Sequence, residues 1–243
     1  MLTLLVKEIN GFLSSLIGYI VIAVFLLITG LFLWVFPLQF NILDYGYASL
    51  ENLFMLTPVV FLFLIPAITM RMFAEEKKAG TIEMLMTKPI SDLQIILSKY
   101  LAGILLVIIS LLPTLIYFFS VYQLGSPKGN IDMGGTWGSY LGLVFLGSGF
   151  VAIGLFCSSI TGNQIVSFIL SVFLSGFFYM GFEFIYSADL FGKFDLFIQS
   201  LGMNAHYTSM GRGVIDTRDV LYFFSLIVVF ILLTKLSLQS RKW

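Results

Sequence analysis

Long apolar runs separated by short polar stretches dominate the chain. A helix that crosses a lipid bilayer needs about 20 mostly apolar residues. Segments of this length occur at about residues 15–36, 53–73, 100–122, 137–158, 165–184 and 219–238. The pattern predicts an all-α integral membrane protein with six transmembrane helices, in which residues 1–243 form one transmembrane domain.

Residues 1–14 show a different, helical periodicity. Polar side chains, including Lys7 and Glu8, lie between apolar residues that recur every three or four positions. This pattern predicts an amphipathic helix on the membrane surface. The alternative is a plain cytoplasmic extension of the first span. The apolar positions are Leu2, Leu5, Ile9, Phe12 and Leu13.

The densest run of charge lies between spans two and three, at residues 71–94. The second helix is expected to continue into water as far as Lys78, because lysines favour a helix C-terminus and Gly80 suits the position just beyond it. Thr81 is then expected to cap a short helix that Pro89 ends. Ile82, Leu85 and Met86 fall on one face of that helix, and Ser91 to Gln94 form a capping box for the next.

Small residues recur at four-residue spacing in spans four and five, which allows neighbouring helices to approach closely. Residues 185–218 are too polar to cross a membrane and too apolar for an ordinary loop, so they predict two short helices at the interface. Proline positions 58, 66 and 113 invite bends in spans two and three. The small residues are Gly138, Gly142, Gly154, Ser158, Ser167, Ser171 and Ser175.

The distribution of Lys and Arg predicts the orientation, because cytoplasmic loops are enriched in these residues. One side holds nine of them: Lys7, Arg71, Lys77, Lys78, Lys88, Lys99, Lys235, Arg241 and Lys242. The other side holds four: Lys128, Lys193, Arg212 and Arg218. We therefore expect both termini and residues 71–94 to lie in the cytoplasm.

Composition agrees with a membrane location. The chain is 59% hydrophobic and 11% charged, whereas a soluble domain carries about 25% charged residues. The formal net charge is zero, which gives no reason to expect nucleic acid as a partner. Cys157 is the single cysteine, so no disulfide forms within the chain.

The sequence offers little catalytic chemistry. It has no phosphate-binding loop of the form G-x-x-x-x-G-K-[ST], and one histidine. The spans are nearly free of ionisable residues, with Glu183 near an outer end, which disfavours an ion-coupled carrier. Met203, His206 and Met210 resemble a copper(I) ligand set, although methionine is common in membrane proteins. Arg212 and Arg218 near Asp216 and Asp219 suggest either an ion-pair network or simple capping of the last span by Asp216 or Thr217.

The motif over residues 71–95, R-x-F-A-E-E-K-x-x-G-T-x-E-x-L-x-T-x-P-I-S-x-x-Q-I, resembles the signature of ABC-2 type transporter permeases. The segment His206 to Asp219 resembles the branch that contains the gliding-motility permease of Bacteroidetes and the permease of the nitrous-oxide-reductase maturation system. The resemblance extends over essentially the whole chain. It implies a type V exporter-like fold with re-entrant outer helices before the last span.

The resemblance also implies roles for particular residues. Residues 75–90 would hold the first coupling helix, which docks on a cytoplasmic ATPase, and residues 158–164 a second, uncharged contact. The docking residues would be Glu75, Glu76, Lys77, Gly80, Thr81, Ile82, Glu83, Leu85, Met86 and Pro89. The second contact would use Ser159, Thr161, Gly162 and Asn163, and the outer mouth His206, Arg212, Gly213, Asp216 and Arg218.

The function implied is that of a non-catalytic permease subunit in the bacterial inner membrane. ATPase partners would bind ATP and Mg²⁺, a second permease chain would complete the transporter, and this chain would hold no cofactor or metal. Gliding motility or associated secretion is the expected setting, and an auxiliary motility subunit is a possible further partner. The alternatives are a permease for copper-linked nitrous-oxide-reductase maturation and a membrane anchor that moves no solute.

Overall fold

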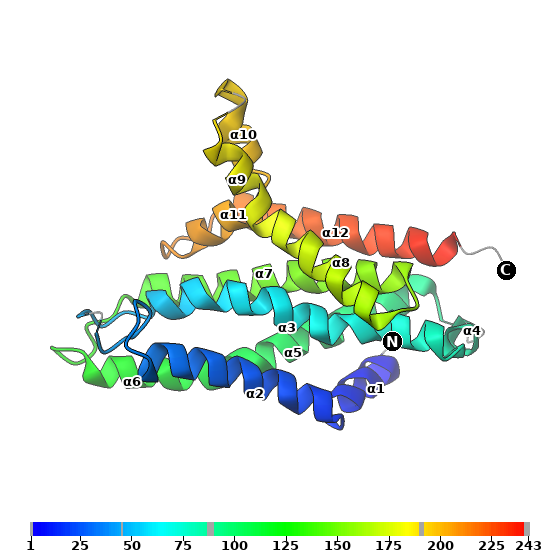
Figure 1. Cartoon of the computed structure of the whole chain (residues 1–243), viewed down its shortest axis with the longest axis horizontal. Coiled ribbons are helices and arrows are strands. Elements are labelled where there is room, and N and C mark those ends of the chain that lie inside the picture. Colours follow the sequence, from blue (N-terminus) through cyan, green and yellow to red (C-terminus); the bar gives the residue numbers. More distant parts are fainter. Residues whose placement is uncertain (1, 45, 87–89, 190–191, 241–243) are drawn as a thin grey trace.

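A computed structural model describes residues 2–44, 46–86, 90–189 and 192–240, and helices form all of the regular structure in these ranges (Figure 1). The first half contains α1 (Leu2–Leu13), α2 (Leu16–Gly30), η1 (Leu31–Val35), α3 (Glu51–Lys78), α4 (Thr81–Met86), α5 (Asp92–Leu111), η2 (Leu112–Thr114) and α6 (Leu115–Leu124). The second half contains α7 (Met133–Ile160), α8 (Gln164–Gly176), η3 (Phe177–Gly181), α9 (Phe182–Ser187), η4 (Gly192–Phe194), α10 (Asp195–Gln199), α11 (Met203–Met210) and α12 (Thr217–Gln239).

Among the described residues, six helical segments are long and apolar enough to cross a membrane. They are Gly18–Val35, Glu51–Lys78, Asp92–Leu124, Met133–Ile160, Gln164–Ser187 and Thr217–Gln239. The number and order of the predicted spans are therefore confirmed. Several helices extend beyond the predicted limits, because capping residues in the loops add turns outside the apolar core.

Helices α7 and α3 form the centre of the bundle, and α5, α8, α11 and α12 pack around α7. Glycine makes this packing possible. A Cβ on Gly154 would lie 2.0 Å from Oγ1 of Thr69 on α3, and one on Gly138 would lie 2.4 Å from the Met210 carbonyl oxygen. Any larger residue at these two positions would force the helices apart, which confirms the close approach that the sequence predicts for span four.

Helix α8 packs on the same centre through its serine face. Ser167, Ser171 and Ser175 are all fully buried, and α8 lies against α3 and α7. The opposite face of α8 is apolar and exposed, as at Phe173. The predicted close-packing stripe of span five is thus confirmed. Helix α8 has one small-residue face packed on the bundle and one apolar face that is exposed.

The spans break at different places for different reasons. Pro113 lies in the short 3₁₀ segment η2, which separates α5 from α6, because proline cannot donate the hydrogen bond that would continue the helix. Pro58 and Pro66 instead lie inside α3, which remains one assigned helix. Two π-helical segments, η1 and η3, interrupt spans one and five and were not predicted.

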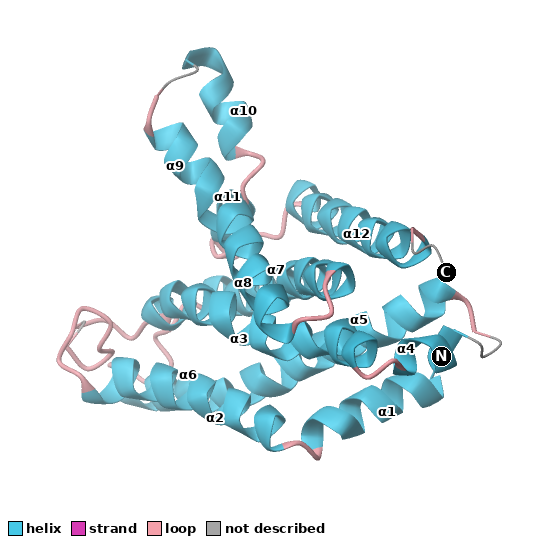
Figure 2. Cartoon of the chain, turned by 45° about the vertical axis from the view of Figure 1, so that its right-hand side comes forward, coloured by secondary structure: helices cyan, strands magenta, loops and turns pink. Residues whose placement is uncertain are grey.

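The two ends of the bundle have different structures (Figure 1). Helices α1 and α4 and the end of α12 lie at one end, and α11 lies towards the other. Figure 2 shows α9 and α10 projecting from the side of the bundle, beyond the helices that surround α7. Helix α1 ends before α2 begins, and Ser15 caps α2 by accepting a hydrogen bond from the Gly18 backbone. A separate N-terminal helix is therefore present, in place of an uninterrupted extension of span one.

Candidate functional site

The candidate site lies at the end of the bundle where α3 emerges beyond the other spans. Helix α3 runs without interruption from Glu51 to Lys78, and Gly80 follows it with φ of +68°. This left-handed conformation favours glycine and turns the chain sharply into α4. The predicted helix end and its glycine are therefore confirmed.

Helix α4 differs from its prediction at the N-terminus. Thr81 is the first helical residue and not the cap, and its hydroxyl donates to the Glu76 carbonyl oxygen of α3 at 3.4 Å. The Thr81 hydroxyl thus bonds to a carbonyl oxygen in the last turn of α3 and does not cap the first turn of α4. The capping box of α5 forms as predicted, with Ser91 accepting from the Gln94 backbone and the Gln94 side chain accepting from Ser91.

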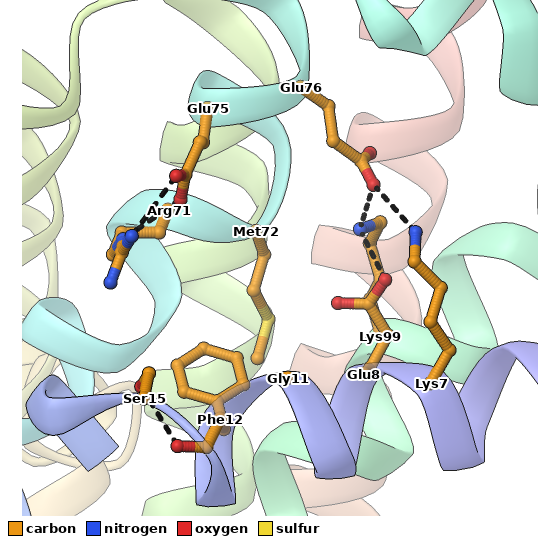
Figure 3. A pocket seen from close by; sticks show the side chains of 10 residues that line it. All are labelled: Lys7, Glu8, Gly11, Phe12, Ser15, Arg71, Met72, Glu75, Glu76 and Lys99. Carbon is orange, nitrogen blue, oxygen red and sulfur yellow. Dashed lines mark hydrogen bonds and ion pairs between the residues drawn. The ribbon is translucent and has the colours of Figure 1, made fainter. Parts of the chain in front are cut away.

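A buried lysine holds three helices together beneath α4 (Figure 3). The Lys99 side chain on α5 is 1% exposed, and its Nζ lies 3.0 Å from Oε1 of Glu8 on α1 and 3.0 Å from Oε1 of Glu76 on α3. The Phe73 ring lies 5.2 Å away, near enough for a cation–π contact. Lys7 adds a longer contact to Glu76 at 3.9 Å. This cluster ties the N-terminal helix to α5 and to the end of α3.

The sequence analysis did not predict this cluster. Glu8 and Lys99 are 91 positions apart in the chain, and no local pattern pairs residues at that separation. One signal was present: helical spacing places Lys99 on the same face of α5 as Ile95, Ile96 and Ala102, all of which are buried. A lysine on a buried face requires a partner.

A serine hydroxyl joins α7 to the backbone of α3 at the point where α3 leaves the bundle. Ser158 Oγ accepts hydrogen bonds from the Phe73 and Ala74 backbone N–H groups and donates to the Met70 carbonyl oxygen, each at 3.0 Å. A side chain inserted into a helical hydrogen-bond ladder is a common cause of a local bend. The end of α3 is therefore anchored to span four.

The link between α7 and α8 lies beside the end of α3. Lys77 Nζ donates to the Ser159 carbonyl oxygen, which also accepts from the Ser237 hydroxyl of α12 at 3.1 Å. A Cβ on Gly162 would lie 3.8 Å from Cβ of Lys77. The two segments that the sequence assigned separately to docking thus meet in one place.

The predicted docking residues divide into exposed and internal groups. Glu75, Gly80, Thr81, Glu83, Gly162 and Asn163 are exposed. Glu76 and Lys77 bind other parts of this chain, and Ile82 and Ser159 are buried. The expectation that Ile82 waits for a partner is wrong, since it packs within the chain. Pro89 lies outside the described residues, as do the side chains of Leu85 and Met86.

At the opposite end, the single histidine fastens α11 to α12. His206 Nδ1 lies 2.7 Å from Oδ1 of Asp219 and Nε2 lies 2.9 Å from the Ser200 carbonyl oxygen, so both nitrogens face acceptors. The ring stacks on Tyr222 with centroids 3.9 Å apart. These contacts fix the orientation of the ring between α11 and α12.

Other residues predicted at the outer mouth have simpler roles. Asp216 caps α12 by accepting from the Arg218 backbone N–H at 2.9 Å. Arg212 and Arg218 are exposed, and neither forms an ion pair with a described residue. The capping alternative is therefore confirmed and the proposed ion-pair network is absent. Gly213 adopts φ of +82° where it passes close to Gly134.

Buried side chains anchor α11 to the bundle. The Tyr207 hydroxyl donates to the Phe54 carbonyl oxygen at 2.7 Å. Burial raises the pKa of this hydroxyl well above its usual value, with a smaller contribution from Tyr179, so it stays a neutral donor. Met203 and Met210 are fully buried in the same packing, while His206 is engaged by Asp219 and Ser200. This arrangement gives the copper interpretation no support.

Comparison with known proteins now identifies the chain at the level of its family. A family model described as ABC-2 family transporter protein matches residues 40–241. The chain belongs to the ABC-2 transporter family. It is accordingly a multi-pass membrane permease of the kind that works with ATPase subunits. A search of curated proteins finds no match.

Proposed function

We propose that this ABC-2 permease couples ATP hydrolysis in cytoplasmic ATPase subunits to movement of its spans, in gliding motility or in secretion associated with it. The observation that carries the proposal is the continuity of α3. One helix runs from the opposite face of the bundle to Lys78 and ends beside α4. A force applied to α4 is therefore applied to span two. The bacterial inner membrane is the proposed location, with α4 in the cytoplasm.

The docking surface we propose combines α4 with the neighbouring link. Lys78, Thr81, Glu83, Gly162 and Asn163 are exposed there. Their mixed polarity suits a contact that forms and releases during each ATPase cycle, because polar, solvent-accessible contacts are typical of transient interfaces. The ATPase would hold ATP and Mg²⁺, and this chain would supply no catalytic residue.

The internal contacts define how movement would spread from this surface. Glu76 connects α3 to Lys99 on α5 and Lys77 connects it to the end of α7. A displacement of α4 would therefore act on three spans together. Residues that bind within the chain would transmit the movement, and the exposed residues would receive it.

A second permease chain is part of the proposal. The face of α8 and α9 that points away from α3 is apolar and exposed, with Phe173 72% and Phe184 68% exposed. Phe173 lies on α8 and Phe184 on α9, eleven positions apart, with the π-helical segment η3 between them. This face suits a second copy or a related permease. An auxiliary motility subunit is a further candidate partner.

Charge reversal at Glu83 tests the docking surface. Glu83→Lys changes an exposed side chain on α4 and leaves the described internal contacts intact. Because repulsion across an interface lowers association, we expect the amount of ATPase that copurifies with the permease to fall about fivefold or more. Stimulation of the ATPase by the permease should fall in parallel.

Asp44→Lys is the matched control, since Asp44 is an exposed carboxylate in the loop between α2 and α3. ATPase binding that is equal in both variants and in the parent would contradict docking at α4. Reconstituted vesicles then separate a transporter from an anchor. ATP-dependent efflux or lipid movement supports transport, and normal ATPase coupling without any movement supports the anchor.

A further inference from the structure

A cavity of about 280 Å³ lies between α1 and the emerging ends of α3 and α5 (Figure 3). Phe12 and Met72 provide its apolar part, and Arg71, Lys7, Glu8 and Glu76 its charged part. It belongs to the end of the bundle where α1 separates from span one.

The charged residues of the lining offer both hydrogen-bond donors and acceptors that the described contacts leave free. Arg71 donates through Nε and Nη2 to Glu75 at 2.9 and 3.0 Å, which leaves three of the five N–H groups of its guanidinium. The Lys7 side chain is 66% exposed and contacts only Glu76, at 3.9 Å, among the described charged groups. A ligand with an anionic group would find donors here.

Acceptors lie a short distance away. Glu76 uses Oε1 for Lys99, and its Oε2 is buried without a partner among the described atoms. A buried carboxylate oxygen without a donor is costly. The second oxygen of Glu8 points away from Lys99 toward the middle of the cavity in Figure 3. A cationic donor in the cavity would satisfy this second oxygen of Glu8.

An exposed apolar ridge leads along α3 into this cavity. Met55, Val59 and Phe63 are 59%, 40% and 56% exposed, and each is four residues from the next. Continuing at this spacing reaches Ala67 and then Arg71. Residues four apart are neighbours on a helix surface. Each step turns about 40° around the helix, so the row winds around α3 and would lead an acyl chain obliquely from the exposed apolar residues to Arg71.

We propose that the cavity binds the headgroup of a phospholipid that carries a primary ammonium, such as phosphatidylethanolamine. The phosphate lies by Arg71, the ammonium by the second oxygen of Glu8, and one acyl chain along the ridge of α3. A primary ammonium donates hydrogen bonds to carboxylates, whereas a choline group has no N–H to donate. A phosphatidylglycerol headgroup would leave this oxygen of Glu8 without a cationic donor. The site does not depend on the ATPase contact.

Lipid retention by the full-length permease tests the proposal. The protein is purified in mild detergent and titrated with dioleoyl phosphatidylethanolamine, phosphatidylcholine or phosphatidylglycerol, and bound lipid is counted by native mass spectrometry. We expect about tenfold preference for the ethanolamine lipid. Arg71→Gln should remove most of that preference, because it removes the phosphate donor. Equal retention of the three lipids would overturn the proposal.

Lys78→Gln is the matched control, because Lys78 is a cation on the same helix but outside the cavity lining. This variant should keep the full preference for the ethanolamine lipid. Thermal unfolding of each variant shows that the fold is retained. Soluble phosphoethanolamine is tested last, as a competitor of the bound lipid. If it displaces the lipid only at a far higher concentration than the lipid itself requires for binding, the result supports a lipid site. If it binds as tightly as the lipid, the result overturns the proposal.

Discussion

Lys99 joins α1, α3 and α5 at the end of the bundle where α3 continues beyond the other spans. Its ammonium is almost fully buried between two carboxylates from different helices. Desolvation of such a group is expensive, so the net gain from the pair is small, but removing one partner leaves uncompensated charge. The cluster therefore specifies which helices meet more than it adds stability.

Lys99→Met is expected to lower the free energy of unfolding by about 2–3 kcal/mol, because Glu8 and Glu76 would remain buried without a cation. Thermal unfolding in detergent measures the change. Lys78→Met, an exposed lysine, is the control and should alter stability by about 0.5 kcal/mol or less. Replacing Glu8 and Glu76 with Gln in the Lys99→Met background should recover most of the loss. Equal melting temperatures for Lys99→Met and Lys78→Met would contradict this role.

The contacts of individual side chains were the part of the structure that the sequence predicted least well. Caps at Ser91 and Asp216 were predicted because each bonds to a backbone group within three residues. The partners of Lys99 and His206 were not, because they come from other helices. Glu76 and Ile82 were assigned to a docking surface on their place in a motif, whereas tertiary contacts turn both inward.

At the scale of helices, the packing of α3 on α7 depends on the absence of a side chain at Gly154. Gly154→Ala would place its Cβ 2.0 Å from Oγ1 of Thr69. We expect a loss of about 1–3 kcal/mol, because overpacking forces neighbouring elements to shift. The melting temperature in detergent should fall accordingly.

Gly176→Ala is the matched control for that change. It lies in α8 with no atom within 4 Å of the added Cβ, so alanine should be neutral or slightly stabilising, by up to about 1 kcal/mol from helix propensity. Destabilisation of the same size at both positions would mean that contact with Thr69 is not the cause.

The helices themselves were predictable because membrane spans are encoded by local apolar length. All six lie where hydropathy placed them, and Pro113 marks a real break. The π-helical segments were not foreseen, since residues 31–35 and 177–181 carry no proline or other local signal for a wider turn. The first turn of α4 was misassigned because Thr81 bonds back to α3.

At the scale of the whole molecule, the exposed apolar face of α8 and α9 is a surface that the described part of the chain does not cover. Phe173→Ala with Phe184→Ala should reduce chemically crosslinked permease pairs about tenfold or more, because exposed aromatics at an interface centre are worth about 2 kcal/mol or more each. Crosslinking in native membranes followed by denaturing gel electrophoresis measures the pairs.

Ile116→Ala with Phe119→Ala provides the matched comparison, since both residues are about equally exposed on α6. Pairing should survive this change if α6 faces lipid. Loss of pairs in both double variants would indicate a general defect in insertion, and loss only in the α6 variant would place the second chain elsewhere.

The position of α1 has a mechanical consequence for the membrane around the protein. Helix α1 joins α5 and α3 through Glu8 and Lys99, while its exposed apolar residues, such as Leu2 and Val6, favour the lipid surface. Its depth therefore follows bilayer thickness, which membrane proteins accommodate at a modest cost per ångström. Since α3 moves with it, a thinner or thicker bilayer changes the height at which α4 stands above the lipid.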